Sequence, residues 1–428
     1  MRGVYVLLLI SLFGYAGRVG GQESVTITQC YEWARANYPQ IHQMGLIDQT
    51  ERYSLSNVGK AWLPQLSVSG KASYQSDVTK LPFDGDKISS LLPGFEIPSL
   101  SKDQYQVVAQ VDQTIWDGGS ARSARALTRA EATANREQLE SELYALNDRV
   151  NQLYFGCLLQ DELIRQNALL QKELQVNIER IEAMMENGVA NQSDLESMEV
   201  ELLNARQNEI ELRASRTVYR QMLATFINKP LTDQVVLKTP ESPERSLSTQ
   251  INRPELRALD AKSEWIETQN KQVTAGLMPR IGAFVQGGYG RPGLNMLEDS
   301  FEPYYVAGVR LSWNLGKLYT LKNDRRKIEV SRRQIDVQRE TFLFNTRLQL
   351  LRQNTEIKKM TDLMRADDDI IRLRTSIKQA AEVKLENGVI SVTDLIREIN
   401  AEDMARQTAA AHRVQRLMTI YNYMYTTN

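Results

Sequence analysis

Two patterns of apolar positions follow one another along this chain. Four short segments, residues 65–74, 104–112, 280–289 and 304–312, carry small or apolar residues at every second position. A period of two predicts strands that each have one apolar face. In the long polar stretches after the strands, apolar residues recur three and four positions apart, which predicts helices that pack as coiled coils. One such seam consists of Leu139, Leu143, Leu146, Val150 and Leu153.

The apolar face of the predicted strands contains the even-numbered residues 66–74 and the odd-numbered residues 105–111, 281–289 and 305–311. Strands of about 9–11 residues with this alternation can span a membrane, and a half-buried hairpin of a soluble protein alternates in the same way. The pattern leaves both interpretations open. Four strands cannot close a membrane barrel, which needs about eight, and open sheet edges cannot face lipid. In a membrane, several chains would therefore have to share one barrel.

The helical pattern is unusually long. Between Ser120 and Asn187 the chain has no proline and a single glycine, Gly156. We therefore predict one continuous helix of about 100 Å, because each helical residue adds about 1.5 Å. A second helix, from Asp194 to about Asn228, is predicted to run antiparallel to the first.

The chain contains this arrangement twice. Residues 37–48 resemble residues 252–263. The offset between the copies changes from 215 to 200 between residues 75 and 104, a segment rich in Pro, Gly, Ser and Asp that is predicted to be a loop. Each copy contains a helix, a strand, a loop, a strand, a very long helix, a turn and a long helix. We predict two structural repeats, residues 22–250 and 251–428.

The most similar parts of the two repeats are MENGVANQSDL, from residue 185, and LENGVISVTDL, from residue 385. Gly188 and Gly388 stand where the end of a helix favours a left-handed residue. Ser193–Asp194 and Thr393–Asp394 stand where the next helix favours an N-cap and an acid. Each stretch is therefore predicted to be the tip of a helix–turn–helix, and a well-capped turn without a partner is one interpretation. The other is a docking surface, indicated by two apolar residues that capping does not explain, Val189 and Val389.

The composition of the chain limits the classes of function that it can have. The net charge of −1 gives no general attraction to nucleic acid. With two His and two Cys, metal cages and Cys/His catalysis are nearly excluded, and no carboxylate stands in a recognisable motif. We expect no catalytic residues, no metal site, no cofactor and no enzymatic activity. Cys30 and Cys157 can form a disulfide or remain buried thiols, and the second is favoured because nothing in the sequence places them together.

The first residues indicate export. Arg2 precedes an apolar run, Val4–Phe13, and small residues follow it. This is typical of a signal peptide, here residues 1–21, with cleavage near Ala16 or Gly21. The apolar run is too short for a transmembrane anchor, which takes about 20 residues.

The motifs and their order resemble one family over essentially the whole mature chain: the TolC-like outer-membrane efflux proteins. The matching stretches are ITQCYEWARANYP, LPQLSVSG, MPRIGAFV, IWDGG and the two tips. The resemblance implies a homotrimer in the outer membrane that extends into the periplasm. Three chains would share a twelve-stranded barrel that touches lipid and continues into an α-helical tunnel. The segment 228–249 and the chain ends would surround the middle of the tunnel.

The resemblance also implies a function. The chain would be a passive export duct, coupled through a periplasmic adaptor to an inner-membrane pump, with the tips as the periplasmic mouth. Gly188, Val189, Gly388 and Val389 would be the docking residues for the adaptor. An alternative is a soluble extracytoplasmic coiled-coil adaptor or spacer. The exported substrate, whether drug, metal or protein, stays open.

The chain departs from the family at the mouth. The best-known member holds its mouth closed with an Arg and a Tyr that bond to an Asp. In this chain Asp194 matches the Asp, but Ile390 stands at the Arg position and Leu385 at the Tyr position. That latch is therefore absent. Asp194 and Asp394 remain candidates for carboxylates near the pore, although Asp394 can equally be a helix cap.

Overall fold

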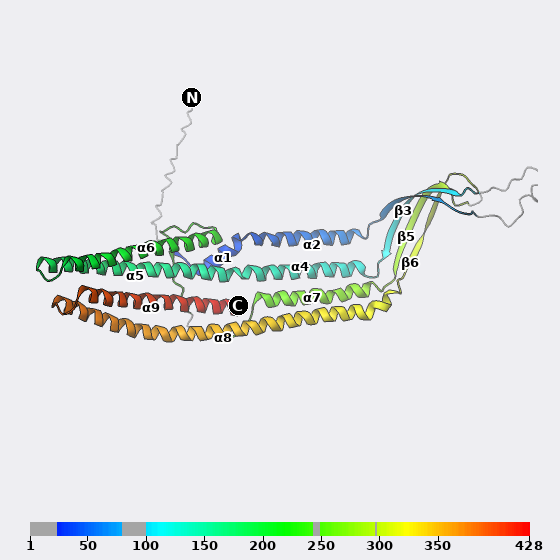
Figure 1. Ribbon diagram of the computed structural model, residues 1–428. Helices are drawn as coiled ribbons and strands as arrows, with labels where there is room; N and C mark the ends of the chain where they lie inside the picture. The colour runs from blue at the N-terminus through cyan, green and yellow to red at the C-terminus, as the bar shows by residue number, and fades with distance from the viewer. Residues whose placement is uncertain (1–23, 79–99, 243–248, 296–297) are drawn as a thin grey trace, which may run out of the picture. The chain divides into compact units, whose positions relative to one another are not determined.

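The protein is described here by a computed structural model covering residues 24–78, 100–242, 249–295 and 298–428, drawn in colour in Figure 1. The predicted signal peptide, residues 1–21, lies outside the described residues. So does most of the loop predicted between residues 75 and 104, since the described part stops at Val78 and resumes at Leu100.

The described residues form two compact units, and each unit draws on both halves of the chain. One unit, here called the hairpin unit, comprises the residues up to Ile41 together with Glu142–Arg253 and Leu343–Asn428. The other, the sheet unit, comprises His42–Ser141 and Pro254–Phe342. The predicted repeats, which divide the chain at residue 250, rest on similarity within the sequence and not on spatial packing, so they stay a prediction.

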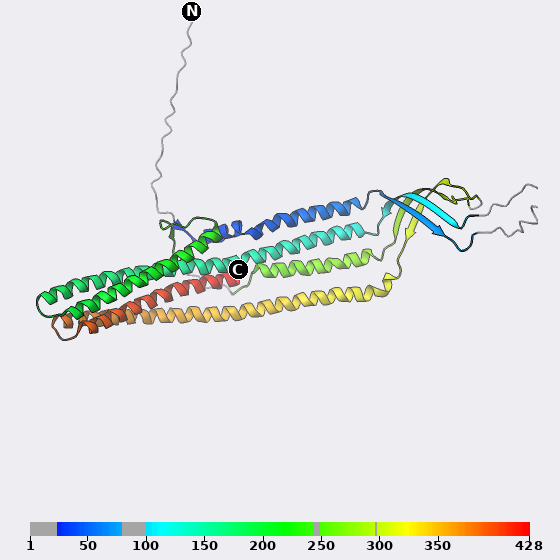
Figure 2. The same cartoon turned by 45° about the horizontal axis from the view of Figure 1, so that its top comes forward.

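The hairpin unit consists mainly of long antiparallel helices. Its elements are β1 (Ser24–Val25), α1 (Ile27–Asn37), α5 (Leu146–Glu186), α6 (Gln192–Ile227), β4 (Val236–Leu237), the second part of α8 (Lys317–Glu386) and α9 (Val392–Thr427). The hairpins α5–α6 and α8–α9 end side by side in two turns, as both Figure 1 and Figure 2 show. The predicted second helix is confirmed in α6, which ends at the left-handed residue Asn228.

The sheet unit contains the four predicted strands. Its elements are α2 (Gln43–Lys60), β2 (Gln65–Tyr74), β3 (Asp103–Trp116), most of α4 (Ser120–Tyr144), α7 (Pro254–Ala275), β5 (Arg280–Arg291), β6 (Glu302–Ser312) and the first part of α8; a short 3-10 helix (Pro39–His42) precedes α2. The strands form one antiparallel sheet in the order β2-β3-β5-β6. Strand β3 runs beyond its predicted end and carries an irregularity between Thr114 and Trp116.

The predicted continuous helix from Ser120 to Asn187 is wrong in one detail. Helical hydrogen bonding is interrupted at Ala145, although this residue keeps right-handed helical angles, φ −61° and ψ −18°. The preceding residue, Tyr144, stacks on Tyr425 with ring centroids 4.9 Å apart and donates a 2.9 Å hydrogen bond to the Tyr425 carbonyl. The Arg253 guanidinium lies over both rings. Packing between distant segments thus accompanies the break, and no proline or glycine marks it.

The predicted apolar seam from Leu139 to Leu153 is buried on both sides of this break. The core cluster that contains Val150 and Leu153 of this seam gathers the start of the described chain, the segment after α6 and the end of α9 against α5. Strands β1 and β4 pair there, and the Tyr154 hydroxyl lies 2.8 Å from the Val25 carbonyl and 2.7 Å from that of Lys238. The described parts of residues 228–249 and of the chain ends thus pack together against α5, and their place around a tunnel stays a prediction.

Cys30 and Cys157 belong to the same cluster as two buried free thiols. Burial raises the pKa of each thiol to about 12. Both therefore stay protonated and unreactive at neutral pH, which agrees with the interpretation that the sequence favours.

Candidate functional site

The two helical tips have nearly the same backbone geometry. Gly188 has φ +73° and Gly388 has φ +67°, the left-handed conformation expected for both. At the first tip, the Val189 N–H donates to the Met184 carbonyl at 2.9 Å, and the Gly188 N–H donates to the next carbonyl, again at 2.9 Å. The second tip repeats both bonds, at 2.8 and 2.9 Å. This is the Schellman arrangement that ends a helix at a glycine.

The predicted N-caps at Ser193 and Thr393 are wrong by two residues. The caps are Asn191 and Ser391, and their side chains accept a hydrogen bond from the backbone N–H of Asp194 or Asp394. The Asp carboxylate in turn accepts from the N–H of the cap residue. Each turn is therefore closed by a capping box, in which the acid belongs at the third helical position rather than at the first.

The Asp394 carboxylate accepts two hydrogen bonds from the cap residue Ser391. Its Oδ2 accepts from the Ser391 hydroxyl at 2.8 Å and from the Ser391 N–H at 3.2 Å. These hydrogen bonds, with a smaller effect of Arg397 whose Nη1 lies 3.6 Å from Asp394 Oδ1, lower the pKa of the carboxyl. The group is an exposed carboxylate at neutral pH.

Around the turn itself, Val189 and Val389 are exposed, at 57% and 68% of their full accessible area. No described atom lies within 4 Å of a side-chain carbon placed on Gly188 or Gly388. Both tips are therefore open on the protomer. This exposure is compatible with docking and does not test it.

Leu385 and Ile390 have a different place. Leu385 is 3% exposed and Ile390 is partly buried against the same apolar cluster. The cluster joins the two hairpins within one chain, and its buried members are Leu174, Ile178, Ile181, Met198, Leu202, Ala205, Ala381, Leu385, Val392, Leu395, Ile396 and Ile399. At the two positions where the resemblance implies a polar latch, this chain therefore packs apolar side chains between its two hairpins.

A partly buried charge network links the same helices α5, α8 and α9, and sequence reasoning missed it. Lys378 on α8 forms ion pairs with Glu173 on α5 and with Glu402 on α9, the latter at 2.5 Å. Glu402 is buried, and it also accepts from Thr375 and Arg406, each at 2.5 Å. All five residues lie in helices and form no recognisable motif, so the sequence does not predict the network.

Burial and hydrogen bonding oppose each other in this network. Burial alone would favour the neutral forms, but the hydrogen bonds prevail, so the pKa of Lys378 is raised and that of Glu402 is lowered. Asp403, beside them on α9, behaves differently. Burial, with a further contribution from the charges of Glu173 and Glu402, raises its pKa to about 6.

The second candidate surface is the apolar face of the sheet. Its rows follow the strand register, as in Leu66–Val111–Val285–Ala307. These side chains are exposed on the protomer, with Leu66 at 71%. The opposite face carries polar rows such as Ser67–Gln110–Gln286. The faces predicted from the alternation are confirmed.

The described parts of the chain lack two other kinds of site. No helix there is both long and apolar enough to cross a membrane. No group of three His, Cys, Asp or Glu side chains gathers where it would hold a metal ion.

Comparison with known families finds one that matches the first half of the chain. Residues 30–229 match the family of outer membrane efflux proteins. No curated protein sequence matches the chain. The match and the shared fold described next support the resemblance to the TolC-like outer membrane efflux proteins that the motifs carry.

Several solved structures share the fold. CusC is 14% identical, with a TM-score of 0.66 over 94% of this chain and 92% of that one. The outer-membrane channel OprN is also 14% identical, with a TM-score of 0.67 and coverages of 94% and 89%. VceC from Vibrio cholerae is 12% identical, with a TM-score of 0.63 and coverages of 93% and 95%.

Proposed function

We propose that this chain is one protomer of a passive outer-membrane export duct. The observation that carries the proposal is the sheet: one face is apolar and exposed, and the edge strands β2 and β6 have no strand beside them among the described residues. Open edges and an apolar face are costly in water, and open edges are not tolerated in lipid. The sheet is therefore incomplete as a monomer.

The strand directions support closure by copies of the same chain. Four antiparallel strands leave β2 and β6 running in opposite directions. The β6 edge of one chain can therefore pair antiparallel with the β2 edge of the next. Three chains would give a barrel of twelve strands, with the apolar rows toward lipid and the polar rows toward the lumen.

In this proposal the hairpin unit forms the periplasmic part. The tips, with Gly188, Val189, Gly388 and Val389, would dock an adaptor protein that couples the duct to an inner-membrane pump. Asp194 and Asp394 would approach the pore axis, in addition to capping their helices. Leu385 and Ile390 would hold the mouth closed by the apolar packing already described. The duct would need no cofactor and perform no catalysis, since its partners would supply the energy.

The alternative, a soluble coiled-coil adaptor or spacer, is disfavoured by the exposed apolar rows of the sheet. In a soluble protein these rows would be covered by other parts of the molecule.

The deciding experiment expresses the full chain with its own leader and separates membranes from soluble extract. We expect the protein only in the detergent extract of outer membranes, as a trimer, and we expect it to conduct ions after reconstitution into a planar bilayer. A soluble monomer would refute the proposal. Detergent-extracted protein that is trimeric but never conducts would refute the duct while leaving the assembly intact.

A further inference from the structure

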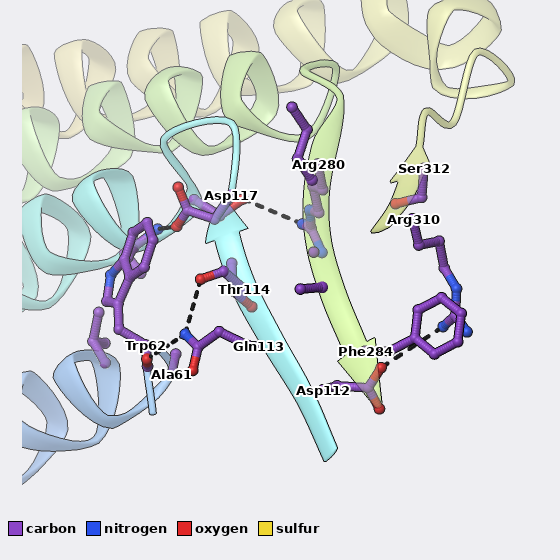
Figure 3. A pocket seen from close by; sticks show the side chains of 17 residues that line it. Ala61, Trp62, Asp112, Gln113, Thr114, Asp117, Arg280, Phe284, Arg310 and Ser312 are labelled. Atoms are coloured by element: carbon purple, nitrogen blue, oxygen red, sulfur yellow. Dashed lines mark hydrogen bonds and ion pairs between the residues drawn. The ribbon is translucent and has the colours of Figure 1, made fainter. Parts of the chain in front are cut away.

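A pocket of about 440 Å³ lies within the sheet unit, where the polar face of the sheet meets α2 and α4. Figure 3 shows its walls. The strands β3, β5 and β6 supply Asp112, Phe284, Arg280 and Arg310 to one side, and Trp62 at the end of α2 stands on another.

A glycine in the middle of β5 leaves room for this pocket. Gly282 stands between Arg280 and Phe284 on the same face of β5, and it pairs with Thr114 and Arg310 on the neighbouring strands. A side-chain carbon at Gly282 would lie 3.2 Å from the Gln113 carbonyl. Glycine therefore leaves the floor free where any other residue would begin to fill it.

The anionic groups of the pocket are already engaged. Asp117 accepts from the N–H groups of Gly119, at 2.8 Å, and Ala121, at 2.6 Å, and so caps α4. Asp112 accepts from the Gln110 side chain at 2.7 Å and lies 3.9 Å from Arg310. Neither carboxylate is left to neutralise a further cation.

The cations are less well matched. Arg280 donates to the Ser120 hydroxyl at 3.2 Å, and no carboxylate of the described residues lies within ion-pair distance of it. Arg310 has only the long contact to Asp112 and places its guanidinium 4.8 Å from the centre of the Phe284 ring. An arginine that has a hydroxyl but no carboxylate beside it is a ready partner for a bound anion.

The rest of the lining is apolar or aromatic. Trp62 offers an aromatic surface, the Phe284 ring already carries the Arg310 guanidinium, and the small apolar side chains are Val58, Ala61, Ala121 and Ala124. Aromatic faces beside a guanidinium suit a flat ring that carries a negative group. Water-soluble inorganic anions would use the arginines but would leave the apolar walls uncovered.

We propose that this pocket binds small aromatic organic anions, such as aryl carboxylates and sulfonates, with Arg280 holding the anionic group and Trp62 holding the ring. The inference deepens the duct proposal and rests on it, because only a duct would place the polar face of the sheet beside passing cargo. It gives the duct a cargo class that the adaptor and the pump would not determine alone.

The test measures binding of naphthalene-1-sulfonate to the full chain in neutral detergent by equilibrium dialysis at low salt, with protein-free micelles as the blank. The Arg280→Gln variant removes the charge and keeps a hydrogen-bonding amide. We expect it to weaken binding about tenfold or more, which is the usual effect of losing a charge-assisted hydrogen bond. Arg333→Gln is the matched control, because this exposed arginine pairs with Glu329 one turn away and lies outside the pocket.

The neutral analogue naphthalene-1-sulfonamide should bind at least about tenfold more weakly than the sulfonate, for the same reason. Equal binding of both compounds, or equal binding by the parent and Arg280→Gln, would overturn the proposal. A lipid headgroup is the other source of an anion with an apolar body. If dihexanoyl phosphatidylglycerol binds through Arg280 while the sulfonate does not, the site belongs to lipid and the aromatic-anion proposal is wrong.

Measurements of conductance distinguish a failure of the binding-site proposal from a failure of the duct proposal. A parent channel that conducts but binds no naphthalene-1-sulfonate leaves the duct standing and removes the cargo site. A parent that binds the sulfonate at Arg280 but never conducts keeps the site and removes the duct.

Discussion

At the scale of single residues, the backbone conformation of the tip glycines opposes substitution, and steric crowding does not. Since the surroundings of Gly388 are open, a substitution there meets only the strain of φ +67°. We predict that Gly388→Val loosens the tip by about 1–2 kcal/mol, the usual cost of the left-handed conformation for an L residue, and reduces export. Gly388→Asn should be much milder, because asparagine tolerates this conformation. Hydrogen exchange of the tip amides measures the first effect, and equal protection in both variants would contradict the argument.

Asp394 has two roles that one substitution can separate. In the duct proposal a trimer brings three copies near the pore axis, where clustered carboxylates attract cations. Asp394→Asn should then weaken a block by divalent cations added on the tip side, while asparagine preserves much of the cap. An unchanged block in single-channel recordings would leave Asp394 as a cap only.

The same carboxylate predicts a pH dependence of the cap. Because the pKa of Asp394 is lowered in the folded tip, its contribution to stability is present above the unfolded value, near 3.8, and is lost as the pH falls below it. We expect the amides at the start of α9 to lose exchange protection as the pH falls below about 4. In Asp394→Asn this acid-dependent step should be absent.

Asp403 should show the opposite sign. Its pKa of about 6 lies above the ordinary value of 3.8, so the folded chain prefers the protonated form. The stabilisation is complete below about pH 4 and is lost as the pH rises through 6. We therefore predict that Asp403→Asn unfolds at a higher temperature than the parent at pH 8, and at nearly the same temperature at pH 4. Asp369→Asn, at an exposed pair with Arg372, serves as the control and should show no such pH-dependent gain.

At the scale of elements, the charge network ties α5, α8 and α9 together. Removing Lys378 would leave the buried Glu402 with Arg406 as its one cationic partner among the described residues. We predict that Lys378→Met lowers the free energy of local opening by about 3 kcal/mol, as is usual when one partner of a buried ion pair is removed. Arg372→Met, which breaks an exposed pair with Asp369, should cost less than about 1 kcal/mol.

Adding Glu402→Gln to Lys378→Met should recover part of the loss, because the uncompensated buried charge disappears. Hydrogen exchange along α8 and α9 measures all these variants. If Lys378→Met and Arg372→Met behave alike, the network contributes no more than a surface ion pair.

Strands and tips could be predicted from sequence because their causes are local. The alternation in β2 follows from a period of two, and Gly388 follows from the demands of a helix end. The N-caps were misplaced because Ser193 and Thr393 are also good caps, and the choice of Asn191 and Ser391 depends on the acid three positions further on.

The break at Ala145, the Lys378 network and the Arg280 pocket were beyond the reach of sequence. Each depends on residues from both halves of the chain, such as Tyr144 with Tyr425 and Glu173 with Lys378. Spacing along one segment carries no information about which residue of another segment will lie opposite.

At the scale of the whole molecule, the duct proposal places one face of each strand against lipid and the other toward the lumen. Substitutions at two adjacent residues of a strand can test this difference. Val68 belongs to the apolar rows of β2, and its neighbour Ser67 belongs to the polar rows. An arginine at a lipid-facing position near the bilayer midplane costs about 2–4 kcal/mol, and a trimer would bear that cost three times. We predict that Val68→Arg abolishes the trimer in outer-membrane extracts. Ser67→Arg should assemble normally and change the ion selectivity of the reconstituted channel, because its charge would face the lumen. Equal tolerance of both substitutions would mean that neither face of the sheet meets lipid, and the proposed shared barrel would have to be abandoned.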